Sequence, residues 1–327
     1  MLRSFHRWPV TLALLLVLSL ATWGCAAGGP AYPTKPVTLI IPFEAGGGPD
    51  GTFRVLAQEA EKELGQKIVV VNRTGGTGSV GVAEVIQSKP DGYTVGMCAV
   101  AVANIQPLLR DVPYKGPDDM LPLVQATEAP MLLYVKADSP FKTLKDLVDE
   151  AKKRPGKVTV SIGGGLYNLP HADVVLFERA AGIKLTAVPY GSAEHLPAVL
   201  GGTVEASTGQ VALMTQHIKA GTVRSLGVFS EARARTLPDV PTFKEQGYDV
   251  SLTPYEFVIA PKGLPDPVKD KLVAAFTKAV KSQAFQEYAE KSGIVLAYLG
   301  PDDLAKRLRG DAEKYRELVQ SAGWKKQ

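Results

Sequence analysis

Apolar, β-branched runs alternate with amphipathic segments along most of the chain from residue 37 onward. Each run has the length and composition of a buried strand, and each amphipathic segment repeats its apolar residues at helical spacing. The first predicted strands are 37–43, 67–73 and 92–100, and the first predicted helices are 51–65 and 78–90. The first helix has an apolar stripe and a glycine stop, formed by Phe53, Leu56, Ala60, Leu64 and Gly65. Continuous apolar strands between such helices predict a parallel sheet covered on both faces.

The alternation is interrupted by two long extended runs, residues 124–140 and 251–265, which have no helical spacing. A second alternating set lies between them, and two amphipathic helices, 266–282 and 301–323, finish the chain. We therefore expect an α/β protein of two lobes joined by two extended crossovers, with a ligand cleft between the lobes and a hinge at the crossovers. The expected division is 32–130 and 252–327 for lobe 1 and 131–251 for lobe 2.

Three glycine-rich turns follow strands and precede helices. They are residues 42–50 and 72–81 in lobe 1 and residues 161–171 in lobe 2. Glycine lets the backbone approach a ligand closely, and a helix N-terminus offers unpaired N–H groups with a partial positive charge. Ligands of such sheets lie beyond the carboxyl ends of the strands. The three turns together predict a clamp for anionic oxygens, and the alternative is that they are only tight connections.

Few side chains that could bind a ligand or react accompany these glycines. Asp50 suits the N-cap of the helix after the first turn, where it would accept an N–H, and direct ligand contact is the alternative. His171 follows the third turn and is a candidate ligand contact. His195 and His217 suit a surface or a helix face better than a ligand site, and Cys98 suits a buried core position.

Several other chemistries lack the residues that they need. Residues 76–81 have the spacing of a dinucleotide-binding turn, but no acidic residue ends the next strand. The histidines and cysteines have no zinc spacing, and no serine stands in a nucleophile elbow. The chain has a net charge of +4 without a basic run, which argues against nucleic-acid binding. We therefore expect no cofactor, no metal, no nucleic-acid partner and no enzyme activity.

The first 24 residues predict an export signal. Two arginines precede an apolar run that is too short for a permanent membrane span. Cys25 directly follows a glycine, as in a bacterial lipoprotein signal, which predicts a lipid anchor on Cys25. Trp23 suits such a signal poorly, and cleavage after Ala27 or Ala31, leaving a free periplasmic protein, is the alternative.

Six segments of the chain together resemble the solute-binding receptors of tripartite tricarboxylate transporters, also called Bug receptors. In order they are YPTKPVTLIIPFEAGGGPD, NRTGGTGSVGVAEV, KPDGYTVGM, VPYGSAEHLPAVLGGTVEAS, IKAGTVRSLGV and LPDVPTFKEQGYDV. The resemblance covers residues 32–324. It implies a two-lobed, type II-like periplasmic-binding-protein fold, the Venus flytrap, that binds a small organic carboxylate and delivers it to membrane permease subunits. We expect the receptor to be a monomer.

The resemblance also implies the ligand contacts. In lobe 1 they are Phe43, Gly46, Gly47, Gly48 and Asp50 in the first turn and Gly75, Gly76, Thr77 and Gly78 in the second. In lobe 2 they are Gly164, Gly165, Tyr167, Asn168, His171, Tyr190, Thr208 and Gln210. The lobe-2 segments 163–168 and 208–210 depart from the usual pattern of the family, so the identity of the carboxylate stays open. An exported sensor that signals to a membrane partner without transport is the alternative function.

Overall fold

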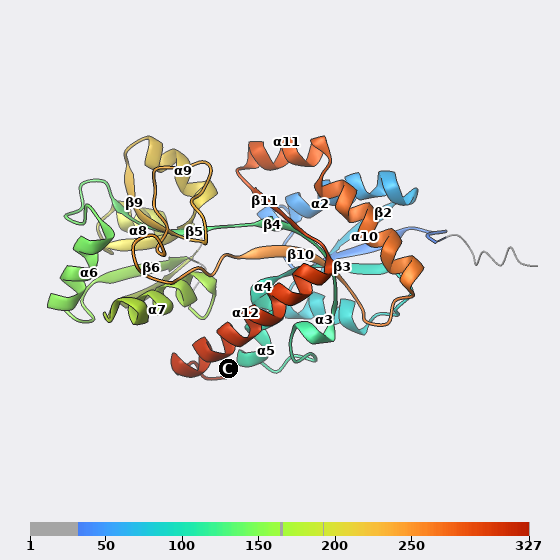
Figure 1. Ribbon diagram of the computed structural model, residues 1–327, viewed down its shortest axis with the longest axis horizontal. Coiled ribbons are helices and arrows are strands. Elements are labelled where there is room, and N and C mark those ends of the chain that lie inside the picture. Colours follow the sequence, from blue (N-terminus) through green and yellow to red (C-terminus); the bar gives the residue numbers. More distant parts are fainter. Residues whose placement is uncertain (1–31, 164–165, 192, 327) are drawn as a thin grey trace, which may run out of the picture.

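The computed structural model describes residues 32–163, 166–191 and 193–326, which form two α/β lobes, each with its own sheet (Figure 1). The lobe-1 strands are β1 (Val37–Ile41), β2 (Ile68–Asn72), β3 (Thr94–Ala99), β4 (Leu121–Glu128), β10 (Tyr255–Ala260) and β11 (Val295–Leu299). The lobe-2 strands are β5 (Met131–Lys136), β6 (Thr159–Gly163), β7 (Thr186–Tyr190), β8 (Ala206–Gln210) and β9 (Val223–Phe229). The two-lobed α/β fold that the sequence predicts is confirmed.

Helices cover the sheets. Those of lobe 1 are α2 (Gly48–Leu64), α3 (Ser79–Gln87), α4 (Val100–Asn104), α5 (Gln106–Leu109), α10 (Asp266–Val280), α11 (Gln283–Ser292) and α12 (Pro301–Ser321), with short 3₁₀ turns at η1 (Gly76–Gly78) and η2 (Pro117–Asp119). Those of lobe 2 are α6 (Leu144–Lys153), α7 (Leu169–Ala181), α8 (His195–Leu200) and α9 (Val211–Lys219). Cys98 of β3 is fully buried, which confirms its predicted core position.

Both sheets are mixed, whereas the sequence analysis predicted a parallel sheet. In the lobe-1 order β11-β4-β10-β3-β1-β2, strands β1, β2 and β3 are parallel, and β10 is antiparallel to both of its neighbours. In the lobe-2 order β7-β6-β8-β5-β9, strands β6, β7 and β8 are parallel, and β5 is antiparallel to its neighbours. The reversed strands β5 and β10 are those on which the chain enters one lobe from the other, and apolar patterning carries no information on strand direction.

The strand directions place the turns of the two lobes opposite each other. β4 runs in the same direction as β1, β2 and β3 and leads into lobe 2, so the carboxyl ends of these strands point toward lobe 2. β6, β7 and β8 run against β5, which comes from lobe 1, so their carboxyl ends point toward lobe 1. The first two glycine-rich turns, and the end of β6 from which the third turn begins, therefore lie on the sides of the sheets that face the other lobe, which we call the interlobe sides.

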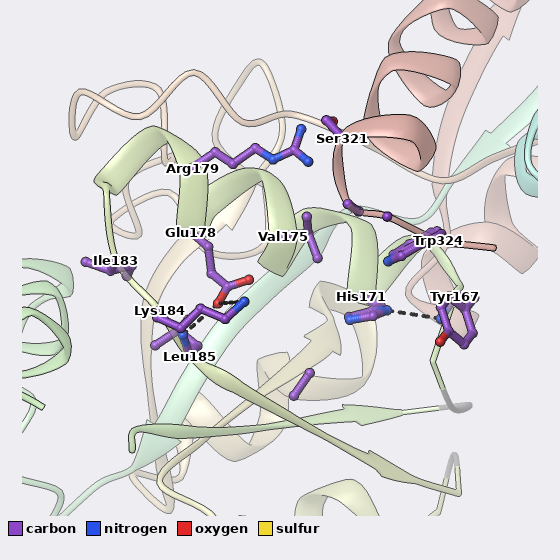
Figure 2. Close-up of a pocket in the computed structure, with 13 residues that line it drawn as sticks. Tyr167, His171, Val175, Glu178, Arg179, Ile183, Lys184, Leu185, Ser321 and Trp324 are labelled. Carbon is purple, nitrogen blue, oxygen red and sulfur yellow. Dashed lines mark hydrogen bonds and ion pairs between the residues drawn. The ribbon is translucent and has the colours of Figure 1, made fainter. Parts of the chain in front are cut away.

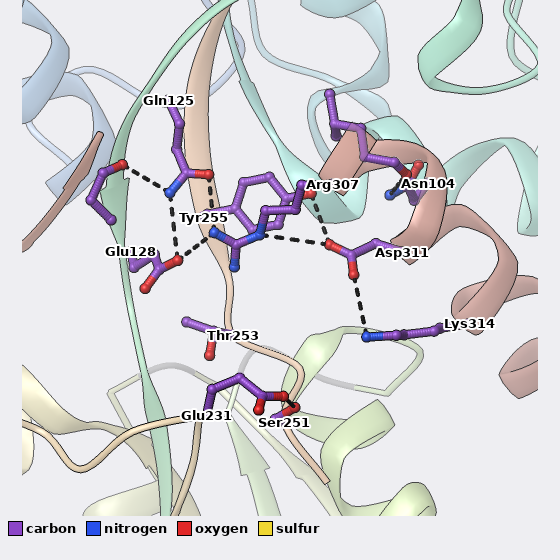
Figure 3. A network of polar contacts seen from close by, with 12 residues as sticks. Asn104, Gln125, Glu128, Glu231, Ser251, Thr253, Tyr255, Arg307, Asp311 and Lys314 are labelled. Carbon is purple, nitrogen blue, oxygen red and sulfur yellow. Dashed lines mark hydrogen bonds and ion pairs between the residues drawn. The ribbon is translucent and has the colours of Figure 1, made fainter. Parts of the chain in front are cut away.

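The two crossovers lie side by side and are braced by the C-terminal helix. The N–H of Ala129, between β4 and β5, donates to the carbonyl of Pro254, just before β10, over 2.8 Å. Figure 3 shows Arg307 of α12 beside both crossovers: its guanidinium pairs with the carboxylate of Glu128 and lies 4.0 Å from the ring centroid of Tyr255. These contacts join the ends of β4 and β10 at the point where the lobes separate.

The C-terminal region contains more elements than the sequence analysis predicted. Between the two expected helices lie a further helix, α11, and the edge strand β11. The Ser282 side chain caps α11 by accepting the N–H of Phe285, and Gly293 ends it in the left-handed conformation. Both residues are visible in the sequence and could have revealed this helix.

No helix within the described residues is long and apolar enough to cross a bilayer. The predicted export signal and Cys25 lie outside the described residues. The predicted division of the chain between the lobes stays a prediction.

Candidate functional site

The first glycine turn is held in place by one buried carboxylate. Asp50 is only 3% exposed, and it accepts hydrogen bonds from the N–H of Gly46 (2.9 Å), Nε of Arg54 (2.8 Å) and Nδ2 of Asn72 (2.8 Å). The same Asn72 amide also donates to the carbonyl of Phe43 (2.9 Å). Asp50 thus connects the turn to the start of α2 and to the end of β2.

The structure corrects the predicted N-cap role of Asp50. α2 begins at Gly48 with Gly47 as its N-cap, so Asp50 lies inside the first turn and reaches back to the preceding backbone. Because Arg54, Gly46 and Asn72 all donate to its carboxylate, the pKa of Asp50 is lowered to about 2. The carboxylate is therefore ionised at neutral pH and fully engaged in positioning the turn.

The second turn has an uncommon backbone conformation. Gly75, Gly76, Thr77 and Gly78 all have positive φ, at 125°, 55°, 56° and 94°. The ring of Phe43, from the first turn, lies against Gly78, where an added Cβ would come within 3.5 Å of it. The two lobe-1 turns are therefore packed on each other.

The lobe-1 turns leave several backbone donors free. The N–H groups of Gly48, Asp50, Gly75, Gly76 and Thr77 donate to no atom in the described part of the chain. Successive free N–H groups and a helix N-terminus form a concave site with a partial positive charge, which suits an anionic oxygen. Free backbone N–H groups are therefore the main hydrogen-bond donors that lobe 1 offers to an anion.

The third turn is described only in part, because Gly164 and Gly165 lie outside the described residues. Asn168 caps α7: its side chain accepts the N–H of His171 (3.0 Å) and donates to the carbonyl of Gly163 (2.9 Å). Tyr190 ends β7, and Gln210 ends β8 with an exposed side chain, so both lie on the interlobe side. Thr208, two residues earlier, is fully buried.

His171 contacts the C-terminal segment. Its ring stacks on Trp324 with centroids 4.9 Å apart, and its Nδ1 accepts the N–H of Tyr167 (3.1 Å). Burial lowers the pKa of His171 to about 4, so the ring is neutral at physiological pH. A ligand contact by Tyr167 or His171 stays a prediction.

Tyr167 and His171 also line a groove of about 480 Å³ between α7 and the end of α12 (Figure 2). Arg179 and Lys184 are its basic residues, and Lys184 lies 3.6 Å from the carboxylate of Glu178. No residue of the two lobe-1 turns lines this groove. It is therefore separate from the free N–H groups described above.

His195 lies on a helix, as one of the two predicted alternatives has it, but it is buried, which contradicts the predicted surface position. It is the first residue of α8 and is 8% exposed. Its Nδ1 lies 2.9 Å from the hydroxyl of Tyr134 and 3.3 Å from the hydroxyl of Ser207. Its partners come from β5 and β8, so only the tertiary structure reveals this cluster. The predicted site residues did not include five residues of these clusters: Arg54, Asn72, Tyr134, Ser207 and His195.

A family model described as the tripartite tricarboxylate transporter family receptor matches residues 52–324. The chain belongs to this family. Protein BugT of Bordetella pertussis is 30% identical to it over 320 residues, which covers 96% of this chain and 98% of BugT. The resemblance found in the sequence is thus confirmed, and the chain is a member of a family of solute-binding receptors.

Solved structures similar to this chain agree with this assignment. A TctC solute-binding protein from Polaromonas, without ligand, has a TM-score of 0.81 at 29% identity and covers 89% of this chain and 99% of that protein. MatC from Rhodopseudomonas palustris, with bound malate, has a TM-score of 0.70 at 26% identity over 88% and 100%. A further R. palustris protein, with adipate, has a TM-score of 0.73 at 26% identity over 89% and 98%.

Proposed function

We propose that this protein is an exported receptor that captures a small organic carboxylate between its lobes and delivers it to a tripartite membrane transporter. The observation that carries the proposal is the set of free backbone N–H groups on the interlobe side of lobe 1, at Gly48 and Asp50 and at Gly75, Gly76 and Thr77. They lie opposite the carboxyl ends of the lobe-2 strands. A ligand held there contacts both lobes.

The chemistry of the lobe-1 turns favours a carboxylate. The two arginines closest in sequence to these turns are already paired, Arg54 with Asp50 and Arg73 with Glu84. Neutral N–H donors with the dipole of a helix N-terminus stabilise an anionic oxygen without requiring a side-chain cation. The malate and adipate in the two R. palustris proteins are ligands of this class.

The remaining parts of the proposal concern location and partners. We propose that the segment before residue 25 directs export, that Cys25 carries a lipid anchor and that the receptor acts as a monomer. We further propose that the closed, ligand-bound receptor docks on the permease subunits. The bound carboxylate is then released unchanged. Family membership and the predicted signal support this account.

A thermal-shift screen of mono-, di- and tricarboxylates tests the binding function. A ligand at 100 times its Kd stabilises a protein by about 2.7 kcal/mol, which is a readily measured increase in Tm. The methyl esters of the same acids are the matched controls, because they lack the anionic oxygens. The expected result is a shift with an acid and none with its ester. If no acid shifts the Tm, or if acid and ester act equally, carboxylate capture is wrong.

Uptake in cells tests the transport function. Removal of the receptor should abolish uptake of the labelled carboxylate that the screen identifies, and restoring the receptor should restore it. Uptake that persists without the receptor, together with a lost cellular response to the acid, would instead support the sensor alternative.

A further inference from the structure

The lobe-2 sheet carries a buried polar cluster in its interior, three residues from the interlobe ends of β5 and β8. Tyr134 of β5 lies directly opposite Ser207 of β8, which in turn lies opposite Ser161 of β6, so the three side chains share one face of the sheet. The ring of His195 covers this face. A hydroxyl-rich patch in a lobe core requires hydrogen-bond partners, and the imidazole supplies one.

The position of the ring depends on a glycine at the end of β6. A Cβ at Gly163 would lie 2.9 Å from Cδ2 of His195 and 3.5 Å from its Nε2, so any larger residue would displace the ring. Gly163 is the last residue of β6 and therefore lies at the interlobe end of the sheet. The Nε2 edge of the ring is thus next to that end, while Nδ1 faces the hydroxyls inside the lobe.

The hydrogen-bond partners favour one of the two positions for the hydrogen of the ring. The Ser207 hydroxyl lies within reach of two carbonyl acceptors, those of Thr208 (3.1 Å) and Ser161 (3.4 Å). The shortest contact of Nδ1 is with the Tyr134 hydroxyl, which can donate to it. Nδ1 then acts as the acceptor, and the single hydrogen of the neutral ring is on Nε2.

The ring is neutral. Burial lowers the pKa of His195, and no carboxylate in the described residues forms an ion pair or hydrogen bond with its ring. Glu194, its neighbour, uses its carboxylate to accept the N–H of Gly191 (3.0 Å). Tyr134 also stays neutral, because burial raises its pKa to about 12.

We propose that His195, fixed by Tyr134 as the neutral Nε2–H form, is the lobe-2 donor that binds the second carboxylate of a dicarboxylate ligand. This inference rests on the proposed function: the free N–H groups of lobe 1 hold one carboxylate, and Nε2 holds the other when the lobes close. His195 thereby selects dicarboxylates over monocarboxylates of the same chain length. Its role differs from that of the lobe-1 turns, because His195 contacts the carboxylate that lobe 1 does not hold.

Calorimetric titration tests the selection with two pairs of acids, adipate with hexanoate and succinate with butanoate. The wild type should bind at least one dicarboxylate more tightly than its monocarboxylate partner. His195→Ala should weaken dicarboxylate binding about tenfold or more, as expected for a lost hydrogen bond to a charged group, and leave monocarboxylate binding unchanged. His195→Gln keeps a donor near Nε2 and should restore part of the loss. His217→Ala, on α9, is the matched control and should change neither.

Nitrogen-15 NMR tests the ring directly, without a ligand. The wild type should show a protonated Nε2 and an unprotonated Nδ1 for His195, and Tyr134→Phe should mix the two forms and weaken dicarboxylate binding severalfold. An Nδ1–H ring in the wild type overturns the proposal even if His195→Ala does not fold.

The possible outcomes distinguish this inference from the proposed function. Carboxylate binding that His195→Ala weakens equally for both members of a pair, or not at all, overturns the role of His195 alone. A wild type that prefers monocarboxylates does the same. A wild type that binds no carboxylate of the broad screen overturns the proposed function and this inference together.

Discussion

The two lobes present different chemistry to the space between them. On lobe 1 the available groups are backbone N–H donors, and a buried carboxylate, Asp50, holds their turn in place. On lobe 2 the cluster consists of side chains, with His195, Tyr134 and Ser207 in contact, and the Nε2 edge of His195 lies next to the interlobe end of β6 at Gly163. Backbone donors bind any carboxylate, whereas side chains can distinguish one ligand from another. We infer that lobe 1 supplies general affinity and lobe 2 supplies selectivity.

The largest effect is expected from a change in the lobe-1 backbone. Gly78 has a φ of 94°, and an added Cβ would lie 3.1 Å from Val102 and 3.5 Å from the ring of Phe43. Gly78→Val should therefore displace the second turn and reduce affinity for every carboxylate by about 100-fold or more, since both the strain and the lost N–H contacts act together. Calorimetric titration measures the loss.

Gly65→Val is the matched control for backbone strain. Gly65 ends α2 with a φ of 70°, and nothing lies within 4 Å of an added Cβ. This variant should lose stability but keep its affinity. Equal affinities of Gly78→Val and the wild type would show that the second turn does not bind the ligand.

A smaller effect is expected from Asp50→Asn. The amide has one acceptor oxygen for three donors, so the turn loses part of its support. The free energy of unfolding should fall by about 1–3 kcal/mol. Affinity should fall for mono- and dicarboxylates alike. Denaturant unfolding and titration measure the two effects. Glu84→Gln, which breaks the exposed pair with Arg73, is the control and should change stability by less than about 1 kcal/mol.

The pH dependence follows from the lowered pKa of Asp50. Its pKa is about 2 in the folded protein, against an ordinary value of 3.8, so its stabilisation is complete above pH 3.8 and is lost as the pH falls toward 2. The wild type should lose stability in this window, and Asp50→Asn should lose less. Parallel curves for the two proteins would contradict the role assigned to the carboxylate.

Glu256 should produce an opposite pH dependence. It lies opposite Ala99 at the interlobe end of the lobe-1 sheet, and its carboxylate accepts a hydrogen bond from the hydroxyl of Thr127 (2.9 Å). Burial raises its pKa from 4.5 to about 7, so the folded state holds the proton more tightly than the unfolded state. Stability should therefore fall as the pH rises from 4.5 to 7, by on the order of 2 kcal/mol.

Melting curves between pH 4 and 8 test this contribution. Glu256→Gln stays uncharged and should flatten the wild-type decrease over that window. An unchanged slope in the variant would show that Glu256 titrates normally in the folded protein.

The parts that were predictable from the sequence depend on neighbours along the chain. The stripe of α2, its stop at Gly65 and the three turns between strands and helices are local patterns, and the structure contains them. The role of Asp50 was not predictable in full, because Asn72 reaches it from another strand. The burial of His195 depends on Tyr134, which is 61 residues away, and on the missing side chain of Gly163. Strand direction likewise depends on how the chain crosses between lobes.

The smallest effect on binding is expected from Cys25→Ser. If Cys25 carries a lipid, the wild type should fractionate with membranes and the variant should be soluble or unprocessed, because several acyl chains anchor a protein stably. The affinity of the purified protein for its carboxylate should not change, since residue 25 precedes both lobes in the sequence. A soluble wild type whose N-terminus begins beyond Cys25 would establish the free periplasmic form instead.

A crystal structure with the tightest dicarboxylate of the screen tests the central claim most directly. We predict one carboxylate at hydrogen-bond distance, about 3 Å, from the N–H groups of Gly75, Gly76 and Thr77, and the other at a similar distance from Nε2 of His195. The lobes should be closed around it. A ligand bound instead in the groove between α7 and α12, against Arg179 and Lys184, would contradict both the interlobe site and the division of labour between the lobes.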